Sequence, residues 1–263
     1  MIKFCSLFSG SSGNCLFIGS GRTKILIDAG VSGKRIIEAL CSIGENPSDI
    51  SAVLISHEHS DHIRSAGIIS RKLDVPIYAN VKTWKSMEHS IGPVKVENKR
   101  FFSTGEELVI GDICVNTFSI PHDASDPVGF NFMVDNRKIT TATDIGHITK
   151  RLLENFESSD LILLESNHDV EMLKVGPYPW SLKKRILGDN GHLSNEMAGK
   201  VIAYMAKKGT RKFLLGHLSK ENNFPELAYQ TVYNVLNENQ ICPGEDIELS
   251  VALRDRVGKV IEL

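Results

Sequence analysis

The sequence predicts an α/β protein built as a four-layer αββα sandwich from two repeated β/α halves. Strand-like apolar runs alternate with runs of helical periodicity along its 263 residues. Landmarks of the first half recur in the second: Asp28-Ala29-Gly30 corresponds to Asp144-Ile145-Gly146, and Ser48-Asp49-Ile50 to Ser159-Asp160-Leu161. Because each half supplies a sheet covered by helices, packing the two sheets together leaves strand ends from both halves along one edge.

The first half opens with three expected strands, at residues 2–8, 15–18 and 24–28, which Gly, Ser and Asn clusters separate. A helix is expected at 36–43, where the apolar positions keep helical spacing, and a buried strand at 52–56. The expected elements of the second half are, in order, strands at 113–118 and 139–144, a helix at 148–156, a strand at 161–164, a helix at 194–207 capped by Ser194, and a strand at 213–216. No linker separates the halves, so a single domain over residues 1–263 is expected.

Composition limits the classes of protein. Hydrophobic residues make up 41% and charged residues 24%, which are ordinary values for a globular chain. No apolar run approaches the roughly 18 residues of a membrane helix, and the first apolar run breaks at Ser9-Gly10, too early for a signal peptide. A cytoplasmic protein with no membrane partner is therefore expected. The net charge of -2 gives no global attraction to nucleic acid.

The cysteines are odd in number, widely scattered and without a C-x-x-C pair. Such residues usually pack as small hydrophobic side chains. We therefore expect reduced core thiols at Cys5, Cys15, Cys41, Cys114 and Cys242.

The densest chemistry lies in the hexapeptide His57-Glu58-His59-Ser60-Asp61-His62, directly after the expected strand 52–56. In extended chain His57 and His59 project to the same side. Asp61 and His62 fall where the chain turns into a helix expected to start near Ile63, so they can face a second ion. The hexapeptide therefore predicts a site for two metal ions.

A dinuclear site needs roughly three to five nitrogen or oxygen donors per ion, so other segments must complete it. His122, Asp144 and His217 each follow a strand-like run, where a loop can present a ligand. A carboxylate can bridge two cations and a neutral imidazole cannot, which makes Asp144 the bridging candidate. Zn²⁺, Mn²⁺ and Fe²⁺ all suit such a site.

The order H-x-H-x-D-H, then a separated His, an Asp and a His, resembles the metallo-β-lactamase-fold hydrolases, with Asp28 matching the first motif of that family. The resemblance extends from Asp28 to His217. It implies one ion held by His57, His59 and His122, a second held by Asp61, His62 and His217, and Asp144 shared between them. Asp28 would orient the histidine loop without binding metal, although a turn-forming Asp before Gly30 is the competing account.

Narrower features resemble the YycJ (WalJ) group of that superfamily. They are Ser9-Gly10-Ser11-Ser12-Gly13-Asn14, Glu165-Ser166-Asn167-His168-Asp169 and Gly188-Asp189-Asn190-Gly191-His192-Leu193-Ser194-Asn195. The resemblance implies a cytoplasmic nuclease, chiefly a 5′ to 3′ exonuclease acting on DNA, with RNA as the other nucleic acid to consider. It gives no expectation for protein partners.

Two cations ~3.5 to 4 Å apart can deprotonate a bridging water, and the hydroxide can then attack a phosphodiester. Asp61 and Asp144 are the catalytic carboxylates of this scheme. His168 and His192 are candidates to bind phosphate or to protonate the leaving oxygen, with a structural hydrogen bond as the competing role. Glu165 ends an apolar strand, where it either steers His168 or a ligand histidine or is a paired core carboxylate.

Two segments are candidates for substrate contact. The small side chains and backbone amides around Ser11, Ser12 and Asn14 suit a phosphate, but a plain hairpin turn explains them equally. The basic run Lys183-Lys184-Arg185 either lines a nucleic-acid path or is a solvated face. Trp84 and Trp180 either stack on bases or pack in the core.

Other functions fit part of the pattern. The same metal pair can hydrolyse a thioester, as in glyoxalase II-like enzymes, or a small cyclic phosphodiester. A di-iron redox enzyme of this fold is disfavoured, because such proteins typically place Glu where this chain has His59 and carry a flavin domain. A metal-binding scaffold without turnover is disfavoured because every ligand position is filled.

Overall fold

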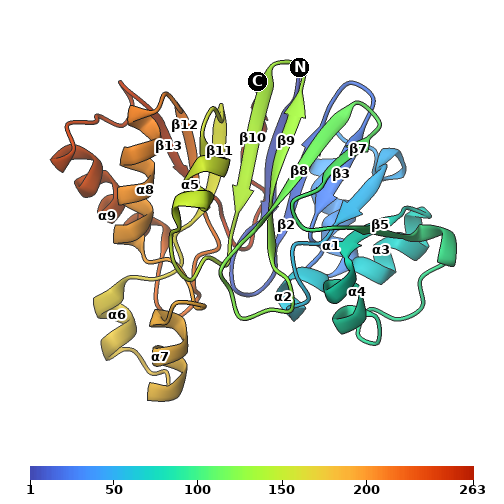
Figure 1. Ribbon diagram of the computed structural model, residues 1–263, viewed down its shortest axis with the longest axis horizontal. Helices are drawn as coiled ribbons and strands as arrows, with labels where there is room; N and C mark the ends of the chain where they lie inside the picture. The colour runs from blue at the N-terminus through green and yellow to red at the C-terminus, as the bar shows by residue number, and fades with distance from the viewer. The chain divides into compact units, whose positions relative to one another are not determined.

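The computed structural model describes residues 1–263, and the chain divides into two compact units (Figure 1). Unit 1 comprises residues 1–119, 124–137 and 253–263, and unit 2 comprises residues 120–123 and 138–252. None of the helices combines the length and the apolar composition that crossing a bilayer requires.

Unit 1 contains a seven-stranded sheet. Its order is β14 (Ile261–Glu262), β1 (Lys3–Phe8), β2 (Cys15–Gly19), β3 (Lys24–Ile27), β4 (Ala52–Leu54), β5 (Ile77–Asn80) and β6 (Lys99–Phe102). Pairing is antiparallel from β14 to β3 and parallel from β3 to β6. The carboxyl ends of β3 and β4 therefore lie next to each other at one edge of the sheet.

Unit 1 also contains the helices that connect these strands and an antiparallel ribbon of three further strands. The elements are α1 (Gly33–Ser42), α2 (Ser60–Ile63), α3 (Ala66–Leu73), α4 (Val81–Met87), the 3₁₀ turns Pro47–Asp49 and Val96–Asn98, and β7 (Glu107–Ile110), β8 (Ile113–Ser119) and β9 (Val128–Val134). A core that includes Phe17, Leu26 and Val53 packs against Ile36 and Leu40 of α1. The apolar face of α1 that the sequence predicted is thus the face that is buried.

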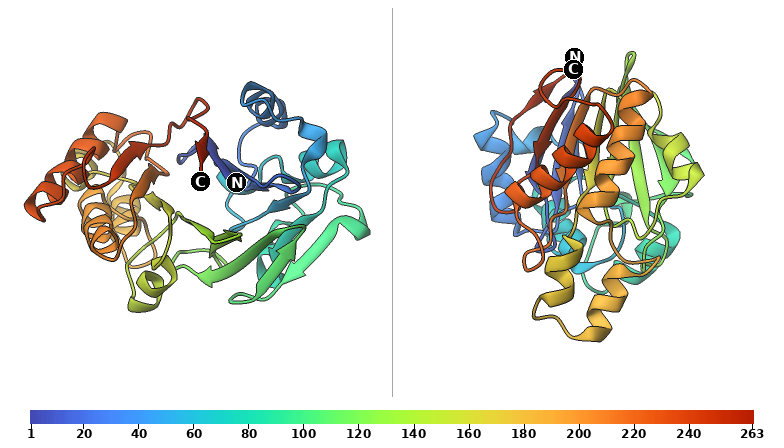
Figure 2. Two further views of the ribbon diagram at one scale, coloured as in Figure 1. Left: turned by 90° about the horizontal axis from the view of Figure 1, so that it is seen from above. Right: turned by 90° about the vertical axis from the view of Figure 1, so that its left-hand side faces the viewer.

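Unit 2 contains four parallel strands in the order β13 (Glu248–Val251), β12 (Lys212–Gly216), β11 (Leu161–Glu165) and β10 (Arg137–Ala142, in this unit from Lys138 onward). Its helices are α5 (Lys150–Phe156), α6 (Val170–Val175), α7 (Trp180–Leu187), α8 (Asn195–Lys207) and α9 (Pro225–Glu238). Helices α8 and α9 lie side by side, and α6 and α7 form a separate pair (Figure 2). Every residue of β11 is buried, as expected for an inner parallel strand.

The internal repeat is visible as a repeated backbone feature. Asp28 follows β3 and Asp144 follows β10, and both adopt a left-handed conformation with φ of 60°. Each is followed two residues later by a glycine, Gly30 or Gly146, where an added Cβ would meet a backbone carbonyl oxygen. The two halves therefore use the same turn to leave a parallel strand.

The helix expected to start near Ile63 begins three residues earlier, at Ser60. His59 has extended backbone angles, and its carbonyl accepts hydrogen bonds from the amides of His62 and Ile63. These two bonds close a first helical turn within the hexapeptide. Asp61 and His62 consequently lie inside α2, and the expected boundary was wrong.

The cysteines differ in burial. Cys5 and Cys15 are buried, Cys114 is half-buried, and Cys41 and Cys242 are exposed; all are free thiols. The expectation of core packing was therefore wrong for Cys41 and Cys242. Cys41 lies near the end of α1 on the face that turns away from the core.

This division predicts selective alkylation. Burial raises the pKa of Cys5 to about 11 and the pKa of Cys15 well above its ordinary value, and the thiolate is the reactive form. We expect iodoacetamide at pH 8 to modify Cys41 and Cys242 in the native protein and to modify Cys5 and Cys15 only in denaturant. Peptide mass spectrometry measures this, and native-state labelling of Cys15 as fast as Cys41 would contradict it.

Candidate metal centre

The unit 1 cluster consists of His57, His59, Asp61 and His62, between the end of β4 and α2. His57 and His62 are almost fully buried. Nε2 of His57 lies 3.0 Å from Nδ1 of His59, and Nε2 of His62 lies 3.6 Å from Oδ2 of Asp61. Three imidazoles and one carboxylate thus point at each other, which is a donor set for divalent cations.

Asp28 orients this cluster from the end of β3. Its Oδ1 accepts a hydrogen bond from the amide of Ser56 at 2.9 Å. Its Oδ2 accepts hydrogen bonds from Oγ of Ser56 at 2.8 Å and from Nδ1 of His62 at 2.7 Å. Because Oδ2 of Asp28 is the acceptor of this bond, His62 carries its proton on Nδ1 and has its lone pair on Nε2.

Ser56 belongs to the site, although the sequence reasoning did not select it as a site residue. Its Oγ also lies 3.1 Å from Nδ1 of His57 and 3.2 Å from Nδ1 of His62. A signal existed, since Ser56 directly precedes His57, and Ser56-His57 in the first half roughly corresponds to Ser166-Asn167-His168 in the second.

The Ser9–Asn14 segment is the turn between β1 and β2, and Asn14 ties it to the cluster. Oδ1 of Asn14 accepts a hydrogen bond from the amide of Gly10 at 2.9 Å. Its side-chain Nδ2 lies 3.0 Å from Nε2 of His62. The backbone amide of Asn14 donates to the carbonyl of Asp61 at 2.8 Å. Ser11 and Ser12 are exposed at the tip of the turn.

Gly30 allows the α2 segment to approach this turn. A Cβ on Gly30 would lie 1.6 Å from the carbonyl oxygen of Asp61, so no side chain fits. The amide of Gly30 donates to the carbonyl of Asn14 at 2.7 Å. The same close approach therefore fixes Asn14 and the backbone of Asp61 together.

The unit 2 cluster consists of Asp144, Glu165, His192 and His217, whose ligand atoms all lie within 4.8 Å of one another. Glu165 is fully buried at the end of β11. Its Oε1 accepts hydrogen bonds from Nδ1 of His192 at 2.8 Å and Nδ1 of His217 at 2.9 Å. Its Oε2 accepts from the amides of Ile145 at 2.6 Å and Leu193 at 3.0 Å.

Two of these bonds, from His192 and His217, help to set the pKa of Glu165. Burial by itself raises the pKa of a carboxyl, but the charge of His192 and the hydrogen bonds from His192 and His217 hold the pKa of Glu165 well below its usual range. Burial alone lowers the pKa of His192, and the carboxylate of Glu165 outweighs it, so the pKa is raised. Glu165 therefore steers His192 and His217, and the expectation that it steers His168 finds no hydrogen bond.

Asp144 faces three imidazoles of unit 2. Its Oδ1 lies 3.4 Å from Nδ1 of His217, 3.7 Å from Nδ1 of His192 and 3.7 Å from Nε2 of His122. Asp144 follows β10 with a left-handed backbone, and its carboxylate lies next to His217, which directly follows β12. Asp144 thus lies where its carboxylate and the neighbouring imidazoles can bind the same cation.

His122 has a fixed tautomer. Its Nδ1 donates to the carbonyl of Gly191 at 3.0 Å, which leaves Nε2 toward Asp144. Burial lowers the pKa of His122, although Asp144 partly opposes this, so the ring is neutral at neutral pH. A neutral imidazole held by a carbonyl through one nitrogen is the usual form of a metal-ligating histidine.

The donor chemistry of both clusters fits a divalent metal. His62, His122 and His217 each have Nδ1 held by a protein oxygen, which makes Nε2 the nitrogen that presents its lone pair. The donors are imidazole nitrogens and carboxylate oxygens without thiolates, a set that Zn²⁺, Mn²⁺ and Fe²⁺ accept.

The basic run of α7 has partners within the protein. Lys183 is nearly buried and donates to the carbonyl of Lys174 at 2.7 Å. The ammonium of Lys184 lies 5.7 Å from the ring centre of Trp180, and Arg185 pairs with Asp123. Lys183 therefore stabilises the packing of α7 against α6, and its charge is withdrawn from solvent.

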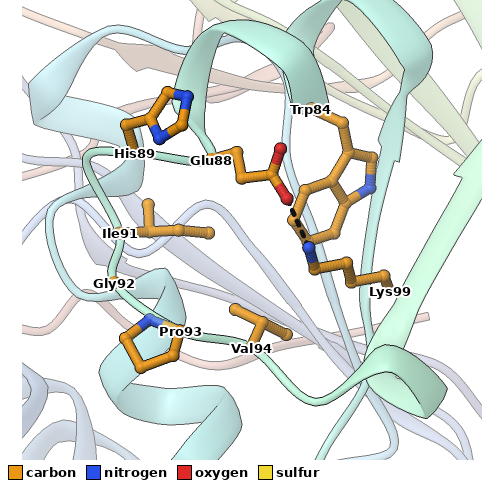
Figure 3. Close-up of a pocket in the computed structure, with 8 residues that line it drawn as sticks. All are labelled: Trp84, Glu88, His89, Ile91, Gly92, Pro93, Val94 and Lys99. Atoms are coloured by element: carbon orange, nitrogen blue, oxygen red, sulfur yellow. Dashed lines mark hydrogen bonds and ion pairs between the residues drawn. The ribbon is translucent and has the colours of Figure 1, made fainter.

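Trp84 lines a cavity of about 400 Å³ in unit 1 (Figure 3). Its Nε1 donates to the carbonyl of Arg100 at 2.7 Å, and its side chain is buried. Lys99, whose ammonium lies 5.8 Å from the Trp84 ring centre, pairs with Glu88. The side chain of Trp84 is thus packed within its own unit, which favours core packing, one of the two roles that the sequence left open for it.

The family model described as the beta-lactamase superfamily domain matches residues 23–218. The chain therefore belongs to the β-lactamase superfamily. Within it, the chain is 45% identical over 249 residues to the exodeoxyribonuclease YycJ of Bacillus anthracis, covering 94% of each protein. It is 43% identical over 249 residues to the exodeoxyribonuclease WalJ of Streptococcus pneumoniae, covering 94% of this chain and 93% of that relative.

Solved structures agree on the fold. The metallo-β-lactamase fold protein YhfI of Bacillus subtilis matches all of this chain and all of its own with a TM-score of 0.71 at 16% identity. Zn²⁺-bound PqqB of Methylobacterium extorquens matches with a TM-score of 0.73 at 15% identity, again over both whole chains. The α/β class and the metallo-β-lactamase fold expected from the sequence are thereby confirmed.

We expect Gly30→Ala to disturb the unit 1 cluster, because the new Cβ would push the carbonyl of Asp61 away from Asn14. Zinc content after dialysis should fall, and the melting temperature should drop by several degrees. Gly21→Ala is the matched control, since a Cβ there meets nothing within 4 Å. Equal zinc content in both variants would contradict the role given to Gly30.

We expect Glu165→Gln to weaken metal binding by about 10–100-fold, the usual effect of losing a group that orients a ligand. The amide cannot accept at both positions, so one of the bonds from His192, His217 or the backbone is lost. Competition with a chelator measures the affinity. Glu171→Gln, on the exposed face of α6, is the control and should keep the wild-type metal affinity. An unchanged metal affinity in Glu165→Gln would contradict the orienting role of Glu165.

Proposed function

We propose that this protein is a divalent-metal-dependent nuclease that hydrolyses phosphodiester bonds in DNA, acting as a 5′ to 3′ exonuclease. The observation that carries the proposal is the near full-length similarity to two exodeoxyribonucleases in a chain whose strand ends bear two clusters of metal donors. We also propose that the protein works in the cytoplasm and that residues 1–263 act as a single domain, since the family match at 23–218 includes residues of both units.

We propose the ligand assignment that the family resemblance implies. One ion would be held by His57, His59 and His122, the other by Asp61, His62 and His217, with Asp144 shared. The tautomers support this assignment because the lone pair is on Nε2 in His62, His122 and His217, and in His62 it accepts from Nδ2 of Asn14. Zn²⁺ and Mn²⁺ suit the all-nitrogen-and-oxygen donor set, and Fe²⁺ is compatible with it.

Bound divalent ions would supply a water activated at neutral pH and positive charge for the phosphate oxygens. The chain's own residues would do the rest. Asp28 and Glu165 would keep the ligand imidazoles oriented, and Asp61 and Asp144 would offset the charge of the ions. His192 would hold a proton on Nδ1 toward Glu165, a position from which its ring can serve the substrate or the leaving oxygen.

We propose that substrate contact comes from His168, His192 and the turn with Ser11, Ser12 and Asn14, and that Lys184 and Arg185 contribute at most long-range attraction. Lys183 is the weakest candidate, because its ammonium is already bonded to Lys174. DNA is favoured over RNA because both relatives are exodeoxyribonucleases.

Cleavage of end-labelled DNA tests the proposal. With Zn²⁺ or Mn²⁺, a duplex labelled at its 5′ end should release labelled mononucleotide at once, and a 3′-labelled duplex only late. His57→Ala and Asp144→Ala should lower the rate by more than about a hundredfold, since even residues that only orient ligands change activity 10–100-fold. His89→Ala, an exposed histidine outside the cluster, should retain wild-type activity.

The same assay decides between substrates. Equal cleavage of labelled RNA would remove the preference for DNA, and release from the 3′ end would reverse the polarity. Hydrolysis of a glutathione thioester with no cleavage of DNA would replace the proposal by the glyoxalase II-like alternative. Undiminished DNA cleavage in His57→Ala and Asp144→Ala would overturn it.

A further inference from the structure

A second cavity, of about 340 Å³, lies in unit 2 among the loops that follow β10, β11 and α7. Three imidazoles and several apolar side chains line it, and no acidic or strongly basic side chain does. The lining includes His147, Ile148, His168, Leu187, His192 and Met197. This combination suits a flat, uncharged ring with polar edges.

His168 is the polar group in this cavity that lacks a partner. It is 1% exposed, and neither ring nitrogen has a hydrogen-bond partner in the protein. Burial lowers the pKa of His168 to about 4, so the neutral ring offers one N–H and one lone pair. Buried polar atoms are rarely left without partners, so a ligand that both donates and accepts would satisfy this ring.

The rim of the cavity is apolar and exposed. Leu187, at the end of α7, is 41% exposed, and Met197, in the first turn of α8, is 40% exposed. His147 stands beside them with Nδ1 2.7 Å from the carbonyl of Asp189, which orients its ring. Large apolar side chains left in water around a cavity are typical of a binding site.

His192 connects the cavity with the unit 2 cluster. Its ring lines the cavity, and its Nδ1 donates to Glu165, which also holds His217. Only His192 therefore separates a ligand in the cavity from the cluster that would bind metal, and a bound metal ion would in turn bind a phosphate. No residue of either metal-donor cluster lines the unit 1 cavity of Figure 3, and its charged residues Glu88 and Lys99 pair with each other.

We propose that this unit 2 cavity binds the base of the terminal nucleotide, which makes the base a determinant of substrate affinity. The inference rests on the proposed nuclease function and extends it by naming the subsite. The volume is near the lower end of the ~300–1,000 Å³ usual for small-ligand sites, enough for one nucleoside unit. Leu187, Met197 and the imidazoles would sandwich the ring, and His168 would meet its polar edge.

Calorimetric titration of the metal-loaded protein with dAMP and with 2-deoxyribose 5-phosphate tests the inference. The second probe keeps the phosphate and lacks the base, so the ratio of the two Kd values isolates base binding. We expect dAMP to bind at least about tenfold more tightly, as stacking of one base on side chains allows. Met197→Trp should fill the cavity and raise the Kd for dAMP to that for 2-deoxyribose 5-phosphate.

Tyr204→Trp is the matched control, because Tyr204 lies on the same helix, is 43% exposed and is outside the cavity. It should preserve the ratio. His168→Phe keeps a ring and removes both nitrogens, and it should lower the preference for dAMP in the same sense. Thermal melting and metal content confirm that each variant is folded and loaded.

Two results would overturn the inference: equal Kd values for the two probes in the wild-type protein, or an unchanged ratio in Met197→Trp. Either result with active DNA cleavage leaves the proposed nuclease function intact. Conversely, a base-dependent ratio in a protein that cleaves no DNA would sink the proposed function while the cavity retained its ligand.

Discussion

Two buried carboxylates hold the histidine clusters in place, and the candidate metal centre depends on them. An ionised carboxyl is stable inside a protein only if its oxygens accept enough hydrogen bonds. Asp28 takes them from Ser56 and His62, and Glu165 takes them from two backbone amides, His192 and His217. The same bonds that stabilise the carboxylates fix loop position, ring direction and tautomer. The rings of His62, His192 and His217 are therefore oriented by the protein itself.

The repeat preserves a backbone turn and assigns its side chains different roles. Asp28 and Asp144 share the left-handed conformation after a parallel strand, and Gly30 and Gly146 each press against a carbonyl. Asp28 nevertheless orients His62, whereas Asp144 faces three imidazoles and leaves the orienting role to Glu165. The turn supplies an aspartate at a strand end, and the neighbouring loops decide its chemistry.

Charge in this protein is local. The net charge is -2, and the most basic run of unit 2 has internal partners for all three residues. A broad electrostatic attraction for a polyanion is thus weak, because the net charge is slightly negative and Arg185 is paired with Asp123. In the proposed nuclease, substrate affinity would then depend on contacts at the site itself, through metal and phosphate and through the cavity that includes His168.

Local sequence patterns were enough to predict features that depend on neighbouring residues. Apolar periodicity predicted elements such as β11 and α8, residue type the cap at Ser194, and spacing the metal-binding hexapeptide, whereas β9 and α9 were not predicted. Even there, the start of α2 escaped prediction because bonds to the carbonyl of His59 set it. Only the tertiary structure decided which partners Glu165 holds, how Asn14 reaches His62, and that His168 lines a cavity without a partner. Those contacts join residues far apart in the chain. A local sequence pattern carries no information about which distant side chain will lie beside a given strand end.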